Sequence, residues 1–217
     1  MALIYDAALQ PSKSEIITNW APNQPWFQGD GAATAVFVAS FRFDDPADAV
    51  GVETHLVRFG AGPLLQIALT YRGAPLVGGE AWLIGTMTHS ILGNRWIYDA
   101  TGDPVYLATV AAAALTGGQQ ADQFLYGANA LTPLALTATV RGSGATSLIV
   151  PEVSAPIVTA NEGRTTVATM GTLSVTVLRV LSDAVHEAQA GQVATLSGIW
   201  AGQDEPCLLV AVGVLSH

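Results

Sequence analysis

Apolar residues in the first half of the chain recur at every second position in short runs, which is the pattern of half-buried strands. Such runs predict strands over residues 2–9, 31–43, 50–59 and 64–71, with the turn sequences DDPAD and GAGP between the later ones. Short connections favour antiparallel pairing of neighbouring strands. In the second run, one strand face is predicted to carry Ala35, Phe37, Ala39, Phe41 and Phe43.

Helical spacing replaces this alternation near the start of the chain. Ile16, Ile17 and Trp20 form an apolar stripe, and Ser12 with Glu15 three residues later is a capping-box pattern. The sequence therefore predicts a helix over residues 13–20. A helix followed by several antiparallel strands must bury its apolar side against one face of the sheet. We expect an α+β fold in which a curved antiparallel sheet wraps this helix.

The stretch 69–106 is the densest in aromatic, glycine, proline and paired polar residues. It predicts two strands, 82–92 and 95–98, joined by a tight turn at Gly93-Asn94. After them, Asp103 is a candidate N-cap with Pro104 at the first helical position. The alanine-rich run from there to residue 116 predicts a buried second helix, which the next two glycines end.

Residues 119–136 are ambiguous, with 121–128 open to a further short helix, and after residue 144 the pattern changes to strands. Apolar runs predict these strands over residues 148–153, 165–170, 173–181, 192–200 and 207–215. A boundary within 136–147 divides the chain into a region 1–140 and an antiparallel β-rich subdomain 141–217. Because glycine and proline are too sparse there for a long linker, we expect the two parts to pack together.

Composition narrows the choice of partners and compartment. The 217 residues carry a net charge of -9 and the basic residues are scattered, so neither nucleic acid nor an anionic membrane is an expected partner. No run reaches the roughly 18 apolar residues of a membrane span. The first residues lack the basic start of a signal peptide, and the single cysteine, Cys207, fits a reducing compartment. We therefore expect a cytoplasmic protein.

Three segments carry a resemblance to a known family: MALIYDAALQPSKSEIITNWAPNQPWF at the start, then TYRGAPL, then LIGTMTHSILGNRWIYDATGDPVY. In this order they resemble the N-terminal cap domain of actinobacterial maltokinases and of relatives fused to or encoded beside trehalose-converting enzymes. The resemblance implies a cystatin-like fold for the first part of the chain. It also implies a role in maltose, trehalose or glycogen metabolism.

The catalytic motifs of a kinase are absent from this sequence. Phosphoryl transfer needs a lysine for the phosphates, acidic metal ligands and a catalytic aspartate. Lys13, the only lysine, lies on the first predicted helix, and no His-Arg-Asp, Asp-Phe-Gly or His-x-Asp motif occurs. We therefore expect that the chain is not an enzyme and binds no cofactor.

Three other groupings are better explained by structure than by catalysis. Glu53 and His55 stand two apart on one strand but lack a third metal ligand, so no metal site is expected. His89, Ser90 and Asp99 have the residue types of a hydrolase triad without a nucleophile elbow, so His89 is expected to hydrogen-bond inside its hairpin. The run GSGATS at 142–147 lacks the ending of a phosphate loop and is interpreted as a turn.

Aromatic residues beside polar ones suit the flat faces of sugar rings, although such residues more often belong to a core or an interface. The aromatic residues in question are Trp20, Trp26, Tyr71, Trp82, Trp96 and Tyr98. The best candidates for a binding surface are His89, Arg95, Asp99, Trp82 and Glu80.

Two functions from different classes remain open. In the first, the chain is a non-catalytic interaction or regulatory module that docks on an enzyme of maltose, trehalose or glycogen metabolism. In the second, it is a small domain that binds an α-glucan or a maltoside. An enzyme with an unfamiliar site is a weaker third possibility. Half of the residues are apolar, which leaves little polar surface for two subdomains and predicts a homo-oligomer.

Overall fold

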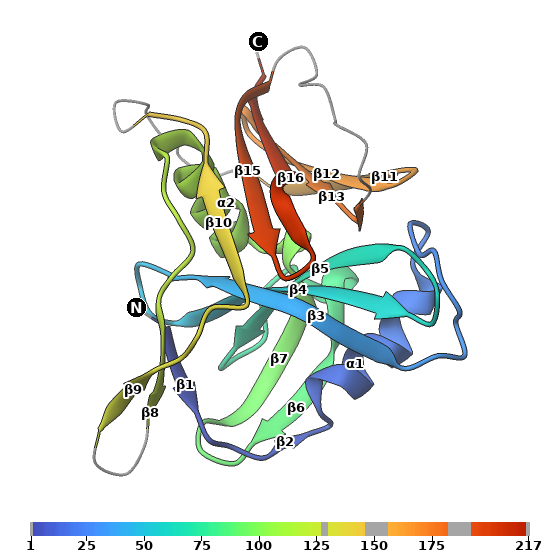
Figure 1. The fold of residues 1–217 in the computed structure, drawn as a ribbon, viewed down its shortest axis with the longest axis vertical. Coiled ribbons are helices and arrows are strands. Elements are labelled where there is room, and N and C mark those ends of the chain that lie inside the picture. Colours follow the sequence, from blue (N-terminus) through green and yellow to red (C-terminus); the bar gives the residue numbers. More distant parts are fainter. Residues whose placement is uncertain (1, 127–129, 146–155, 182–191, 216–217) are drawn as a thin grey trace.

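The computed structural model describes residues 2–126, 130–145, 156–181 and 192–215, and these form a mostly antiparallel β protein (Figure 1). The described part contains two large sheets, a small three-stranded sheet and two α-helices. None of its helices is long and apolar enough to cross a membrane. Single turns of 3-10 helix lie between other elements: Ala21–Asn23 (η1) between α1 and β3, Glu80–Trp82 (η2) between β5 and β6, and Ala100–Gly102 (η3) between β7 and α2.

The first large sheet is curled and has the strand order β2-β6-β7-β5-β4-β3 (Figure 1). All pairs within it are antiparallel, as the short connections predict. A further short strand, β14, pairs with the first residues of β5. The bounds are β2 Leu9–Gln10, β3 Ala35–Phe43, β4 Val50–Phe59, β5 Leu64–Arg72, β6 Leu83–His89, β7 Gly93–Asp99 and β14 Val180–Leu181.

Helix α1 (Lys13–Trp20) covers one face of this sheet. The Ser12 side chain accepts from the amide of Glu15 while the Glu15 carboxylate accepts from the amide of Ser12, which confirms the predicted capping box. Ile16 and Ile17 are buried in one apolar cluster with residues of β4, β5, β6 and β7. A helix of eight residues is too short to be stable alone, so packing on the sheet stabilises α1.

A β-bulge in β3 divides that strand between the two faces of the sheet. Phe37 pairs with Val57 and Ala39 pairs with Leu56, so Val38 is an extra residue. Ala35 belongs to the cluster under α1, whereas Ala39 lies in the cluster on the opposite face. The prediction of one common face over residues 35–43 is therefore wrong, because the bulge shifts the alternation by one residue.

The hairpin of β6 and β7 also differs from its prediction. The strands end at His89 and resume at Gly93, so the turn consists of the residues between them and not of Gly93-Asn94. Gly93 has a φ of 74°, which places it in the left-handed region that a three-residue hairpin loop requires after its turn. The sequence pattern located the turn two residues too late because it took Gly93 as the centre of the turn.

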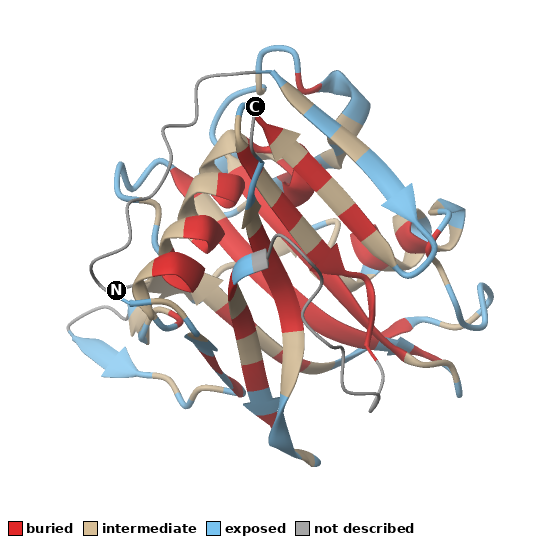
Figure 2. Ribbon diagram, turned by 90° about the horizontal axis from the view of Figure 1, so that it is seen from above, coloured by how far each residue is buried: buried red, intermediate tan, exposed pale blue. Residues whose placement is uncertain are grey.

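The second large sheet has the order β10-β15-β16-β13-β12-β11 and carries helix α2 (Pro104–Thr116) on one face. Figure 2 shows buried residues running along the strands beneath this helix. The predicted N-cap Asp103 and the predicted end at Gly117, in the left-handed conformation, are both confirmed. The strands are β10 Ala138–Gly142, β11 Ile157–Glu162, β12 Thr165–Met170, β13 Leu173–Leu178, β15 Gln192–Trp200 and β16 Gln203–Val214.

Apolar residues of both large sheets and α2 form one buried cluster. The predicted strand over 173–181 is interrupted at Arg179, where the chain leaves the second sheet and β14 joins the first. The predicted strand over 148–153 and the predicted turn over 182–191 lie outside the described residues. The division into regions 1–140 and 141–217 stays a prediction.

The small sheet contains β1 (Ala2–Tyr5), β8 (Gln123–Tyr126) and β9 (Leu131–Pro133). β1 runs parallel to β8, and β9 runs antiparallel to it. The sequence left 121–128 open to a short helix, but residues 123–126 form a strand because β1 and β9 pair with it on both sides. The strand expected over 2–9 is broken into β1 and β2.

Candidate functional site

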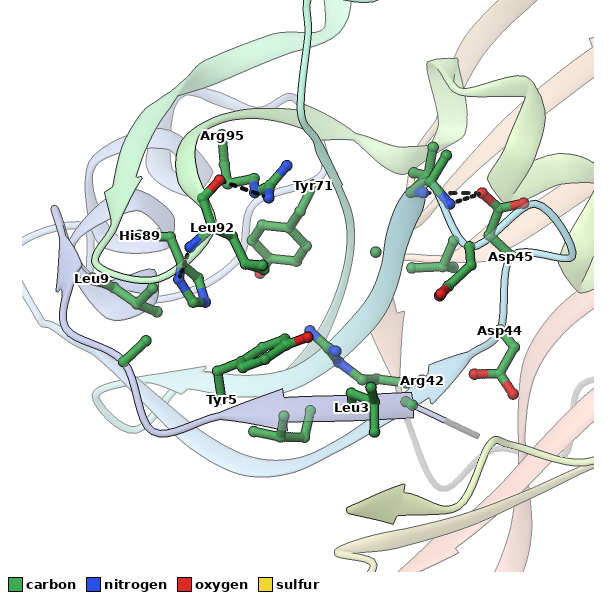
Figure 3. A pocket seen from close by; sticks show the side chains of 18 of the residues that line it. Leu3, Tyr5, Leu9, Arg42, Asp44, Asp45, Tyr71, His89, Leu92 and Arg95 are labelled. Carbon is green, nitrogen blue, oxygen red and sulfur yellow. Dashed lines mark hydrogen bonds between the residues drawn. The ribbon is translucent and has the colours of Figure 1, made fainter. Parts of the chain in front are cut away.

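A pocket of about 360 Å³ opens between β1, the turn from β3 to β4 and the end of the β6–β7 hairpin (Figure 3). Strand β1 supplies apolar side chains and Tyr5, whereas the hairpin supplies His89 and Arg95. Lys13 and Arg42 reach the pocket from α1 and β3, and Tyr71 from β5. The pocket therefore combines side chains from segments that are distant in the sequence.

A buried carboxylate, Glu53 of β4, holds the two cations in place. It lies 2.5 Å from Lys13 Nζ and 3.2 Å from Arg42 Nη2. Its neighbour on the same strand face, His55, places Nε2 3.4 Å from Glu53 Oε2 and 3.2 Å from the Tyr71 hydroxyl. Alternation along β4 puts Glu53 and His55 on one face, and the bulge in β3 turns Arg42 toward the same side.

The pKa values in this cluster depend on burial and on the presence of two cations beside one carboxylate. Burial alone would raise the pKa of Glu53, but the charges of Arg42 and Lys13 outweigh it and hold that pKa well below its ordinary value. Burial lowers the pKa of His55 more than the carboxylate raises it. Burial, together with the Glu53 charge, raises the pKa of Tyr71. At neutral pH the cluster thus holds a carboxylate, two cations and a neutral imidazole.

Glu53 and His55 are bound to protein side chains in this arrangement. No group of three or more His, Cys, Asp or Glu side chains able to hold a metal ion occurs within the described ranges. Lys13, Arg42 and Tyr71 were not predicted as partners of this pair. The single lysine in the first turn of a helix was an available signal, but its distance to Glu53 depends on how α1 lies on the sheet.

His89 forms the hairpin turn itself. Its Nδ1 accepts from the amides of Ile91, at 3.2 Å, and Leu92, at 3.1 Å, so the neutral ring carries its proton on Nε2. Hydrogen bonding inside the hairpin, which the sequence predicted for His89, is confirmed. Burial lowers the pKa of His89, and the positive charges of Arg95, Lys13 and Arg42 lower it further.

The residues of the apparent triad are not brought together. Ser90 Oγ accepts from the amide of Ala8 instead of contacting His89. Asp99 lies in the interior, where Arg179 Nη2 reaches its two oxygens at 2.6 and 2.7 Å. The guanidinium of Arg179 also stacks on the ring of Trp26, 4.9 Å from its centroid. Asp99 therefore belongs to the junction between the sheets.

The five candidate surface residues occupy three separate places. His89 and Arg95 line the pocket. Asp99 is in the junction. Trp82 and Glu80 both belong to η2, and the Trp82 indole donates to Thr159 Oγ1 on β11 at 3.1 Å. Glu80 is exposed on η2. Arg179 was missed, although a lone arginine inside the apolar run LSVTVLRVL is a recognisable sign of a buried ion pair.

The described part of the glycine-rich run at 142–147 packs against the C-terminal end of α2. The amides of Gly142, Ser143 and Gly144 donate to backbone carbonyls of Gly118, Thr195 and Ala114. These three amides are therefore already used within the protein, which removes the donors that a phosphate loop would offer.

Residues 20–103 match the family model of the maltokinase N-terminal cap domain. The match supports the resemblance that the sequence motifs carry, and it covers β3 to β7, which form most of the first sheet. The matched segment includes the pocket residues Arg42, Tyr71, His89 and Arg95. No curated protein sequence matches the chain.

Proposed function

We propose that the chain is a non-catalytic, cap-like module that docks on a partner enzyme of maltose, trehalose or glycogen metabolism. The observation that carries this proposal is the match of residues 20–103 to the maltokinase cap domain in a chain whose sequence lacks kinase motifs. The ion pair between Lys13 and Glu53 adds support, because the only lysine is committed to a buried carboxylate. Such a module acts in the cytoplasm and takes its metabolic role from its partner.

A pull-down with the tagged full chain from native cell extract tests this docking. The recovered protein is then purified and its binding to the chain is measured by calorimetry. An enzyme that acts on maltose, trehalose or an α-glucan and binds with a defined stoichiometry is the expected result. Stable binding only to proteins of unrelated metabolism would contradict the proposal.

A phosphotransfer assay tests the non-catalytic part. The purified chain should transfer no phosphate from ATP to maltose, trehalose or glucosamine, because its sequence lacks the kinase motifs that position ATP and magnesium. Turnover above background that is lost on changing one carboxylate would instead support the weaker alternative of an enzyme with an unrecognised site.

We also propose that α1 and the first sheet have a cystatin-like arrangement, and that the chain self-associates. Self-association is supported by exposed apolar side chains such as Val77, Leu83 and Ile91 within the segment that matches the cap domain. Sedimentation at micromolar concentration tests it, and a monomer at all concentrations would contradict it.

A second candidate function is the binding of an α-glucan or a maltoside. It is supported by Tyr71, the one member of the predicted aromatic set that lines the described pocket. Trp26 and Tyr98 are buried in the interior instead. Retention of the chain on an α-glucan column, reversed by free maltose, would favour this function over docking.

A further inference from the structure

We propose that the pocket between β1 and the β6–β7 hairpin binds a small organic anion, a carboxylate or a phosphate monoester, through Arg42, Arg95 and His89. This inference goes beyond docking on a partner, and neither depends on the other. It rests on the kinds of polar groups that face the pocket and on which of them the protein already uses.

The pocket presents hydrogen-bond donors that the described residues leave unused. Arg42 Nε is buried without an acceptor there, although Nη2 of the same side chain is bound to Glu53. His89 Nδ1 is occupied by backbone amides, so the neutral ring carries its proton on Nε2, a donor without an acceptor among the described residues. Arg95 uses one nitrogen for the carbonyl of Leu92, at 2.8 Å, and keeps further N–H groups. An occupant must therefore bring acceptors.

The positive charge around these donors exceeds what the nearest carboxylate neutralises. Glu53 balances one charge but contacts both Lys13 and Arg42. Arg95 has no carboxylate within ion-pair distance in the described part of the chain. The charges of all three cations act on His89, and Figure 3 shows two of these cations, Arg42 and Arg95, at the pocket with His89. In a chain of net charge -9, this local excess favours an anion.

Three acidic residues, Asp44, Asp45 and Asp48, line the other end of the pocket, at the β3–β4 turn, whereas the charges that act on His89 are those of the three cations. Asp45 accepts from the amides of Ala47, Ala49 and Val50 at 2.9 to 3.0 Å, so its carboxylate is engaged in shaping the β3–β4 turn. The charge of Asp44 acts on Arg42, and that of Glu53 acts on it more strongly. The donors at the hairpin end, His89 and Arg95, are left for the ligand.

The size and the walls of the pocket indicate an organic anion and not a bare inorganic one. A volume of about 360 Å³ lies at the lower end of the range of small-molecule sites. Leu3, Leu9 and Leu92 line it beside the polar groups. Such walls would bury the carbon skeleton of a ligand while the guanidinium groups hold its charged oxygens.

Calorimetric titration of the full chain tests the proposal. Glucose 1-phosphate represents the phosphate monoesters, succinate represents the carboxylates, and glucose is the uncharged comparison. Binding of either anion is expected, weakening as salt is added, with glucose binding at least about tenfold more weakly. Arg95→Gln should weaken anion binding about tenfold, because one charge-assisted hydrogen bond is lost. Arg58→Gln is the matched control, since Arg58 also donates to a single loop carbonyl, that of Gly62, but lies outside the pocket.

Three outcomes would overturn the proposal. The first is that neither anion binds at concentrations up to about 10 mM, which exceeds the dissociation constants of specific ligands. The second is equal weakening by Arg95→Gln and Arg58→Gln, and the third is tighter binding of glucose than of glucose 1-phosphate. Docking on a partner enzyme is measured by the separate pull-down, so a failure here leaves that result unaffected.

Discussion

Arg179 donates from Nη2 to both carboxylate oxygens of Asp99, at 2.6 and 2.7 Å, and so ties the junction of β13 and β14 to the end of β7. The arginine side chain is fully buried and also donates from Nε to Thr166 Oγ1. Asp99 in turn holds the amide of Thr101 in η3. One buried pair thus joins the first sheet to the second.

Asp99→Asn should therefore destabilise the protein by about 3 kcal/mol, because it leaves a buried arginine without its counter-charge. Urea denaturation measures this loss. Asp30→Asn is the control, since Asp30 also accepts a backbone amide, that of Ala32, but is exposed and should cost under about 1 kcal/mol. Equal costs for the two variants would show that the Arg179 pair adds no stability.

Gly142→Ala should destabilise the protein by more than about 2 kcal/mol through a steric clash. A Cβ at this position would lie 2.0 Å from the carbonyl oxygen of Ala113, at the end of α2. Gly85→Ala is the matched control, because Gly85 also lies in a strand and its Cβ would meet nothing within 4 Å. Thermal melts of both variants test the packing of β10 on α2, which similar melting temperatures would contradict.

Gly93→Val should cost more than about 1 kcal/mol, because its φ of 74° is strained for a β-branched residue. The space around Gly93 is open, so the cost arises from the backbone alone. Gly93→Asn should cost clearly less, since asparagine tolerates the left-handed region better than valine does. Chemical denaturation of the pair checks this order, and a valine variant as stable as asparagine would refute the strain.

The free energy of unfolding should fall as the pH is lowered below 6.5, and further below 4.5. In the folded protein the pKa of His55 lies below its ordinary value of 6.5, and that of Glu53 below 4.5. Both groups bind a proton more readily in the unfolded chain, so their stabilising contributions are complete above those values and are lost on acidification. Denaturation at a series of pH values measures this, and a flat profile between 6.5 and 4.5 would contradict the His55 part.

Glu53→Gln should remove the acidic part of that profile. At neutral pH it should also cost about 3 kcal/mol, since Arg42 and Lys13 lose the carboxylate that neutralises them. Denaturation of this variant beside Glu15→Gln separates the buried carboxylate from an exposed one that only caps α1. Similar losses in both would show that the Glu53 cluster contributes nothing beyond a surface pair.

The sequence by itself determined the features that depend on residues a few positions apart. Ser12 with Glu15 started α1, Asp103 with Pro104 started α2, and Gly93 took a positive φ, because each of these signals acts within about one turn of the chain. The alternation of apolar residues likewise located β4 and β5. The motifs of the first half pointed to the cap-domain family.

Only the tertiary structure decided which side chains meet. The extra residue in β3 exchanged the two faces of that strand, and so brought Arg42 to Glu53 rather than to the opposite face of the sheet. Asp99 was a candidate surface residue from the sequence. It meets Arg179 because the chain leaves the second sheet after β13 and β14 pairs with the first. The pocket is assembled from segments up to about 90 positions apart, and no local pattern encodes such contacts, because they depend on strand register and on long-range packing.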